Sequence, residues 1–376
     1  MQLKVSIYGL TTEGFGLAKK LSESAEVYVV DEMLQTGFML TKDLARESLE
    51  NLMEEEPLLE VLPIEKAISN SNLVFFCPRL RRFGEEVLIE VSSRLRELSR
   101  YISSGCTVIN CVPTGLGGNS ENIQIIEKQS GLKVGQDITY CYFPFRPKES
   151  WSDIFASTPG HSVSIEKIGL SNTSQNILAA ELEYIQDLLD STLMLVSAIE
   201  LNKKAREAKV KIKQNISAYI DQMVGRLFDL RAVQAREEFS ETVAYLAGSI
   251  LKNLESFSRY LADVVRDALR ERSLRASKTK VVLLWSIDKY EMRPDRIFTS
   301  ESIQQRLRDY VTDVDVLSSQ ALHTGLDSFD KLKSNIVVLC SGKDANEFAN
   351  LQARRSSEMI VLHARPDIET FSGSFK

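Results

Sequence analysis

The chain has 376 residues, of which 43% are hydrophobic and 26% charged, and a formal net charge of −6. This length predicts two or three domains with a sizeable core, and the acidic balance excludes a broad basic surface for nucleic acid. The five cysteines form no CxxC pair and the three histidines lie far apart, so no metal site is predicted. No apolar run is long enough to span a membrane. Cysteines in apolar runs indicate reduced thiols and a cytoplasmic protein.

The first part of the chain alternates strand-like and helix-like segments. A β-branched apolar run at 4–10 is followed by helical spacing of apolar residues at 14–24 and by a second strand-like run at 26–33. Two further strands, near 72–77 and 106–112, are separated by an amphipathic helix. Strands that alternate with helices predict a parallel sheet with helices on both faces.

The middle of the chain is predicted to be helical, because it lacks proline between Pro159 and Pro294 and its apolar residues recur every three or four positions. Segments 177–192, 193–230 and 235–272 are read as long helices, typical of a bridging or dimer-forming region. The C-terminal part returns to short buried strands and a helix, with Ser300 predicted as the N-cap of that helix.

These patterns predict an α/β protein with long central helices. An N-terminal Rossmann domain is expected over residues 1–175, a central helical dimerisation region over 176–276, and a C-terminal Rossmann-like α/β domain over 277–376.

The segment GLTTEG has the position of a phosphate-binding turn, between a strand and a helix. In a dinucleotide-binding unit one glycine permits the turn, a second lets the pyrophosphate approach, and a third packs the helix on the strand. These positions hold Gly9, Thr11 and Gly14. Thr12, at the helix N-terminus that receives the phosphate, is a further predicted cofactor residue. Asp31 follows the second strand at the spacing of a carboxylate that binds ribose hydroxyls. The pattern predicts NAD as the cofactor.

Thr11 leaves two interpretations of this turn open. Its Cβ is expected to crowd the pyrophosphate, whereas its hydroxyl is able to bond a phosphate oxygen. The alternative to a working NAD site is a Rossmann fold with an empty cleft. The basic run RLRRFG follows a strand at the edge where open α/β sheets bind ligands, so Arg79, Arg81 and Arg82 form either a phosphate contact or a solvated loop.

The order of these features resembles the nucleotide-sugar dehydrogenases, the family of UDP-glucose and UDP-N-acetylmannosamine 6-dehydrogenases. KVSIYGLTTEGFGLAKKL is similar to the family's opening, and TVINCVPTG to its strand ending STVPPG, which adds Pro113 to the cofactor residues. YFPFRP resembles the PER segment, SAIELNKKAREA the start of the central dimer helix, and EMIVLHARPDI a strand of the UDP-binding domain. The resemblance implies NAD, a nucleotide or nucleotide sugar, and a homodimer formed through the central helices.

The same resemblance exposes departures in the chemistry. The family oxidises an alcohol to an acid through a cysteine in a GxGGxC segment, but the corresponding residues, 264–280, include no cysteine and no glycine. Cys111 stands where the family has a water-ordering threonine, and Phe145 where it has the PER glutamate. Lys203 matches the lysine that stabilises oxyanion charge and is the candidate catalytic residue.

Arg146 and Arg296 are the candidates for substrate contact by the same resemblance. Two functions follow. The first is a divergent protein that binds NAD and a UDP-sugar without the four-electron oxidation. The second is an NAD-dependent oxidoreductase that acts on the CH–OH group of a UDP-sugar with altered residues. The sequence leaves open whether the chain is an enzyme.

Overall fold

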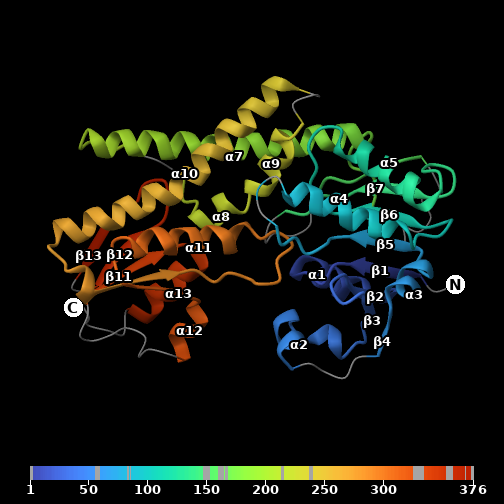
Figure 1. The fold of residues 1–376 in the computed structure, drawn as a ribbon, viewed down its shortest axis with the longest axis horizontal. Coiled ribbons are helices and arrows are strands. Elements are labelled where there is room, and N and C mark those ends of the chain that lie inside the picture. The colour runs from blue at the N-terminus through green and yellow to red at the C-terminus, as the bar shows by residue number, and fades with distance from the viewer. Residues whose placement is uncertain are drawn as a thin grey trace. The chain divides into compact units, whose positions relative to one another are not determined.

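The structure, a computed structural model, describes residues 3–55, 60–82, 84, 86–146, 153–159, 165, 168–212, 216–236, 240–324, 334–352, 359–368 and 370–373. The chain divides into two compact units, which we describe separately (Figure 1). The first contains Met1–Leu188, Arg231–Leu246 and Asp288–Pro294, and the second Leu189–Leu230, Ala247–Ile287 and Asp295–Lys376. Each contains a largely parallel sheet, and long helices join them in sequence, so the predicted α/β class is confirmed.

The first unit is built on an eight-stranded sheet in the order β4-β3-β2-β1-β5-β6-β7-β8. Its five central strands are parallel: β2 (Glu26–Asp31), β1 (Lys4–Tyr8), β5 (Leu73–Phe76), β6 (Thr107–Asn110) and β7 (Thr139–Tyr142). Its outer strands are antiparallel to their neighbours: β3 (Thr36–Met39), β4 (Val61–Pro63) and β8 (Ala156–Ser157). Every residue of β5, β6 and β7 is buried, as expected for strands covered on both faces.

The described helices between these strands are short, and most begin at the carboxyl edge of the sheet. They are α1 (Thr12–Leu21), the 3-10 turn η1 (Leu44–Arg46), α2 (Leu49–Glu55), α3 (Ile64–Ser69), α4 (Glu86–Ser99) and α5 (Gly118–Ser130). Because the carboxyl ends of parallel strands meet at one edge, the loops after β1, β5, β6 and β7 are neighbours there.

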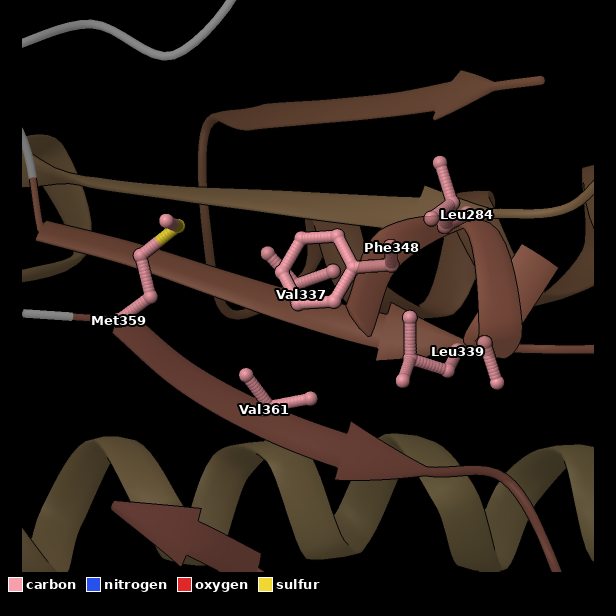
Figure 2. Packing of buried hydrophobic residues seen from close by; sticks show 7 residues of the cluster. Leu284, Val337, Leu339, Phe348, Met359 and Val361 are labelled. Atoms are coloured by element: carbon pink, nitrogen blue, oxygen red, sulfur yellow. The ribbon is translucent and has the colours of Figure 1, made fainter. Parts of the chain in front are cut away.

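The second unit has a five-stranded sheet in the order β10-β9-β11-β12-β13. The parallel strands are β9 (Thr279–Leu284), β10 (Asp313–Leu317), β11 (Ser334–Leu339) and β12 (Met359–His363), and β13 (Thr370–Gly373) is antiparallel. Its described helices include α11 (Asp295–Arg308), α12 (Ser319–Thr324) and α13 (Gly342–Gln352), with the 3-10 turn η2 (Ala276–Lys278) before β9. Figure 2 shows Phe348 of α13 over Val337, beside Leu284 and Val361, in the core of this unit.

The central helices differ from the prediction. α7 (Ile177–Glu207) and α10 (Glu241–Glu271) are 31 residues long, but segment 193–230 is not one helix. Lys209 adopts a φ of 56° and the amide of Val210 bonds the carbonyl of Ala205, a left-handed helix end. Two short helices follow, α8 (Ile220–Val224) and α9 (Leu227–Gln234). At the break Ala208, Val210 and Ile212 recur every two residues, a change of spacing that the reading as one helix overlooked.

The predicted N-cap at Ser300 is also wrong, because α11 begins at Asp295, directly after Pro294. Ser300 lies inside the helix, where its hydroxyl donates to the carbonyl of Ile297 at 2.9 Å. A proline followed by an acidic residue is itself a helix-start signal. Within the described residues, no helix is both long and apolar enough to cross a membrane.

Candidate functional site

The turn after β1 has the backbone geometry of a dinucleotide-binding turn. Gly9 has a φ of 121°, and a Cβ there would lie 2.0 Å from the carbonyl oxygen of Cys77, so only glycine fits. A Cβ at Gly14 would lie 2.9 Å from the Thr11 hydroxyl oxygen and 3.0 Å from the carbonyl oxygen of Gly9. The first and third glycines of the pattern therefore have the predicted structural roles, the turn and the close packing of helix on strand.

The side chain of Thr11 points into the protein and has a structural role there. Thr11 is fully buried and is the N-cap of α1, with its hydroxyl accepting from the amide of Gly14 at 3.0 Å. The same hydroxyl donates to the carbonyl of Cys77 at 3.4 Å. In this conformation its single O–H is already donated within the chain, so it is not free to donate to a phosphate oxygen.

Most backbone amides from Gly9 to Phe15 have an acceptor within the chain. A bound pyrophosphate would need some of these amides, because it accepts hydrogen bonds from the N-terminus of the helix. The amides of Gly9, Leu10 and Thr11 donate to the carbonyl of Val30, the carboxylate of Glu32 and the carbonyl of Gly9. Those of Thr12, Gly14 and Phe15 donate to the carbonyl of Tyr290, the hydroxyl of Thr11 and the carbonyl of Thr11.

The acceptor for Thr12 comes from a distant segment, residues 288–293, which belongs to the same compact unit. The amide of Thr12 donates to the carbonyl of Tyr290 at 2.8 Å, and the amide of Met292 donates to the Glu13 carboxylate at 2.9 Å. The carbonyl of Met292 in turn accepts from the amide of Leu80 at 3.0 Å. The segment therefore lies against the loops that follow β1 and β5.

Two arginines fix the rest of this segment. The Arg79 guanidinium donates to the carbonyl of Lys289 at 2.6 Å and lies 4.8 Å from the centre of the Tyr290 ring. Arg293 donates to the carbonyl of Phe145 at 2.6 Å, in the loop after β7. Of the predicted basic run, Arg79 thus binds the chain itself, and Arg82 pairs with exposed Glu86 at 3.1 Å.

Two carboxyl groups lie beside the turn. Glu32 is 1% exposed and accepts from the amides of Leu10 at 3.3 Å and Arg79 at 2.7 Å. Burial raises the pKa of Glu32, and burial also raises the pKa of Glu13 by more than nearby Arg293 lowers it. When ionised, both groups repel the negative charge of a diphosphate. Their raised pKa values mean that each must otherwise keep its proton.

Asp31 and Pro113 occupy the expected strand ends. One Asp31 oxygen accepts from the amides of Met33 at 2.8 Å and Leu34 at 3.2 Å, which shapes the turn between β2 and β3. Pro113 is buried in the turn after β6. The frame of a dinucleotide site is present, but most amides at the helix N-terminus are taken and two carboxyl groups flank them. In this arrangement the residues do not fit the pyrophosphate of NAD.

A second helix start at the same edge is also filled by the chain. Glu181 of α7 is 2% exposed and accepts from the amides of Gly117 at 2.8 Å and Asn119 at 2.9 Å, at the N-terminus of α5. It also accepts from the Asn119 side chain at 2.9 Å. The carboxylate thus takes the position in which an anion would complement the helix dipole.

The residues that resemble the family's reacting positions cannot exchange protons here. Cys111 is fully buried, and burial together with neighbouring Cys77 raises the pKa of its thiol well above the usual value. Phe145 is 1% exposed and packs edge-on against Phe143, with ring centres 5.6 Å apart. Arg146 forms an ion pair with Asp187 at 3.3 Å.

The two remaining candidates belong to the second unit and have structural contacts there. Arg296 is 3% exposed and donates to Asp221 at 2.9 Å, which also accepts from the indole of Trp285 at 2.7 Å. Lys203 lies in the last turns of α7 and not at its start, pairs with Glu200 at 2.7 Å and lies 5.5 Å from the Tyr260 ring centre. Within the first unit, the predicted cofactor residues lie at or after the carboxyl ends of β1, β2 and β6.

Sequence reasoning missed Glu13, Glu32 and the 288–293 segment. An acidic residue inside a turn that should receive a diphosphate was the available signal for Glu13. Nothing local could have indicated that a segment almost three hundred residues away bonds the turn. Among the described residues, no three His, Cys, Asp or Glu side chains are placed to hold a metal ion.

Both units have Rossmann-type, largely parallel sheets, and several solved structures share this fold. The sequence matches no protein-family model and no curated protein. UDP-D-ManNAc dehydrogenase from Pyrococcus horikoshii is similar with a TM-score of 0.66 and 14% identity, over 99% of this chain and 98% of that one. UDP-glucose dehydrogenase from the archaeon Pyrobaculum islandicum has a TM-score of 0.59 and 12% identity, over 97% and 94%.

A third similar structure is the NDP-N-acetyl-D-galactosaminuronic acid dehydrogenase from Methanosarcina mazei, with a TM-score of 0.51 and 14% identity, over 98% of this chain and 92% of that one. The chain therefore has the fold of the nucleotide-sugar dehydrogenases. The resemblance seen in the sequence is confirmed at the level of the fold, over nearly the whole length of these proteins.

Proposed function

We propose that the chain is a non-catalytic homologue of the nucleotide-sugar dehydrogenases. The proposal rests on the residues found at the two positions where the family has reacting groups. Cys111 and Phe145 are both buried, and neither holds a transferable proton near neutral pH. The sequence also has no cysteine between residues 264 and 280 to form a covalent intermediate.

The other interpretation, NAD-dependent oxidation of a CH–OH group with altered residues, requires a general base near the substrate. Lys203 is the candidate for stabilising oxyanion charge and not for the base, and its ammonium group is paired with Glu200 on the same face of α7. None of the cofactor residues predicted at the first sheet is a titratable base, apart from Asp31, which shapes a turn. We therefore favour binding without oxidation.

The proposed ligand is a nucleotide or nucleotide sugar, a class supported by the names of the similar structures. The proposed assembly is a homodimer formed through the central helices. It is supported by apolar side chains that α7 leaves exposed: Leu178, Leu182, Met194 and Leu201. A role in regulation or assembly follows if ligand binding is retained while oxidation is lost.

The test of lost catalysis is an NADH-formation assay. The purified chain is incubated with NAD and either UDP-glucose or UDP-N-acetylmannosamine, and the P. horikoshii dehydrogenase serves as the active control. We expect no NADH above background. Formation of NADH together with the uronic acid would overturn the proposal.

Ligand binding is measured separately by calorimetry with UDP-sugars. Heat of binding that saturates is expected from a protein that keeps nucleotide-sugar recognition. Its complete absence at millimolar ligand contradicts the ligand class without affecting the conclusion on catalysis.

A further inference from the structure

We infer that residues 288–293, here called the closing segment, hold the first unit's dinucleotide cleft shut, and that release of this segment opens the cleft. The inference goes beyond the loss of oxidation, because it concerns access of a cofactor and not the reaction. It rests on contacts within one compact unit.

The closing segment occupies the position at which a pyrophosphate would bind. A phosphate oxygen at a helix N-terminus accepts hydrogen bonds from the first free amides of the helix. The first such amide of α1 is that of Thr12, and the carbonyl oxygen of Tyr290 accepts from it at 2.8 Å. The Gly14 amide is already taken by the Thr11 hydroxyl at 3.0 Å. A dinucleotide must therefore displace the Tyr290 carbonyl before it can bind.

The closing segment is anchored by three loops of the same sheet edge. The loop after β1 contributes Thr12 and the Glu13 carboxylate, and the loop after β7 contributes the Phe145 carbonyl. The loop after β5 contributes the Leu80 amide and the Arg79 side chain, which both bonds Lys289 and covers the Tyr290 ring. Contacts at both ends of the segment explain how a stretch without regular structure keeps one path across the cleft.

The charged groups around the turn also disfavour binding of a diphosphate. A diphosphate brings negative charge to a turn that already has the Glu13 carboxyl group in its helix and buried Glu32 behind it. Arg293 is the cation beside Glu13, and it is engaged with the Phe145 carbonyl. The turn, α1 and Asp31 keep the geometry of a cofactor site, so removal of the segment leaves a cleft that a dinucleotide can enter.

The test uses the full chain and two measurements, hydrogen exchange at the Thr12 amide and NADH binding followed by fluorescence. In the unaltered chain we expect a protected Thr12 amide and no saturable binding at millimolar NADH. Arg79→Ala removes the bond to Lys289 and the stacking on Tyr290, and should speed Thr12 exchange about tenfold. Arg79→Ala with Glu13→Ala also removes the acceptor of Met292 and one negative charge, and should bring NADH binding into the measurable range.

Arg100→Ala with Glu23→Ala is the matched control, because it removes the same charges from exposed positions away from the closing segment and its anchoring loops. It should leave both measurements unchanged. The inference is overturned if the unaltered chain binds NADH while hydrogen exchange at residues 289–292 stays constant. It is also overturned if neither Arg79 variant changes exchange at the Thr12 amide. A double variant that exposes the Thr12 amide and still binds no NADH overturns it as well. These readouts do not depend on turnover, so they fail independently of the proposed function.

Discussion

Gly9 is the residue of the turn that tolerates a side chain least. An alanine there would combine a φ of 121° with a Cβ at 2.0 Å from the Cys77 carbonyl oxygen. We expect Gly9→Ala to lower the free energy of unfolding by about 3 kcal/mol, measured by urea denaturation. Gly16→Ala is the control, since that glycine is helical with open space around it, and should raise stability by about 0.5–1 kcal/mol.

Thr11 acts as a helix cap and not as a ligand contact. Thr11→Ala removes the acceptor of the Gly14 amide and should cost about 1 kcal/mol of stability. Thr11→Ser keeps the hydroxyl and should recover most of that loss in the same urea titration. Equal stability of the two variants would show that the hydroxyl does not cap α1.

Glu13 should give the protein a measurable dependence of stability on pH. Its folded-state pKa is raised by burial, so its contribution is complete below the usual glutamate pKa of about 4.3 and is lost as pH rises through the raised value. Glu13→Gln cannot ionise and still offers an oxygen to the Met292 amide. We expect the variant to be more stable than the unaltered chain at neutral pH, and this advantage to vanish in acid, by denaturant unfolding at both pH values.

For single residues, the sequence predicted the place in the fold better than the direction of the side chain. Gly9, Gly14 and Asp31 could be placed because strand, turn and helix follow each other at fixed spacing. The direction of the Thr11 side chain depends on the Cys77 carbonyl of another strand end, which no local pattern contains. The burial of Glu32 likewise depends on the amide of Arg79.

Among the elements, α5 depends on α7 for its beginning. The N-cap of α5 is Gly117, which has no side chain to satisfy the free amides, and Glu181 supplies the acceptor from α7. Glu181→Ala leaves buried donors without a partner and should cost about 3 kcal/mol, measured by thermal or urea unfolding. Gln186→Ala, at an exposed position of the same helix, should stay within about 0.5 kcal/mol.

The helices also show where a periodic pattern fails. Apolar spacing correctly indicated helix on both sides of residue 209 but not the break between α7 and α8. The break is a backbone conformation at Lys209, a residue type with no preference for positive φ, so the residue itself gave no sign of it. Because α7 ends at Glu207, Lys203 lies near the end of this helix and not near the start of a longer one.

At the scale of the whole molecule, the predicted homodimer remains to be measured. Met194 and Leu201 are 62% and 59% exposed on α7, and burial of such side chains is what a helix-mediated interface would supply. We expect sedimentation analysis to give twice the mass of one chain, and Met194→Glu with Leu201→Glu to give the mass of one. Ile89→Glu, at an exposed position of α4, should leave the mass unchanged, and an unaltered chain that sediments as a monomer contradicts the prediction.

The hydrogen bond between the Thr12 amide and the Tyr290 carbonyl has a consequence for how ligands of this protein are sought. A ligand that binds only the open form has its apparent dissociation constant multiplied by the inverse of the open fraction. If one molecule in a thousand is open at a given moment, a micromolar binder behaves as a millimolar one, an order-of-magnitude illustration of that relation. Thermal-shift screens of the unaltered chain would then miss true ligands of the first cleft, whereas the same screen of Arg79→Ala with Glu13→Ala would detect them.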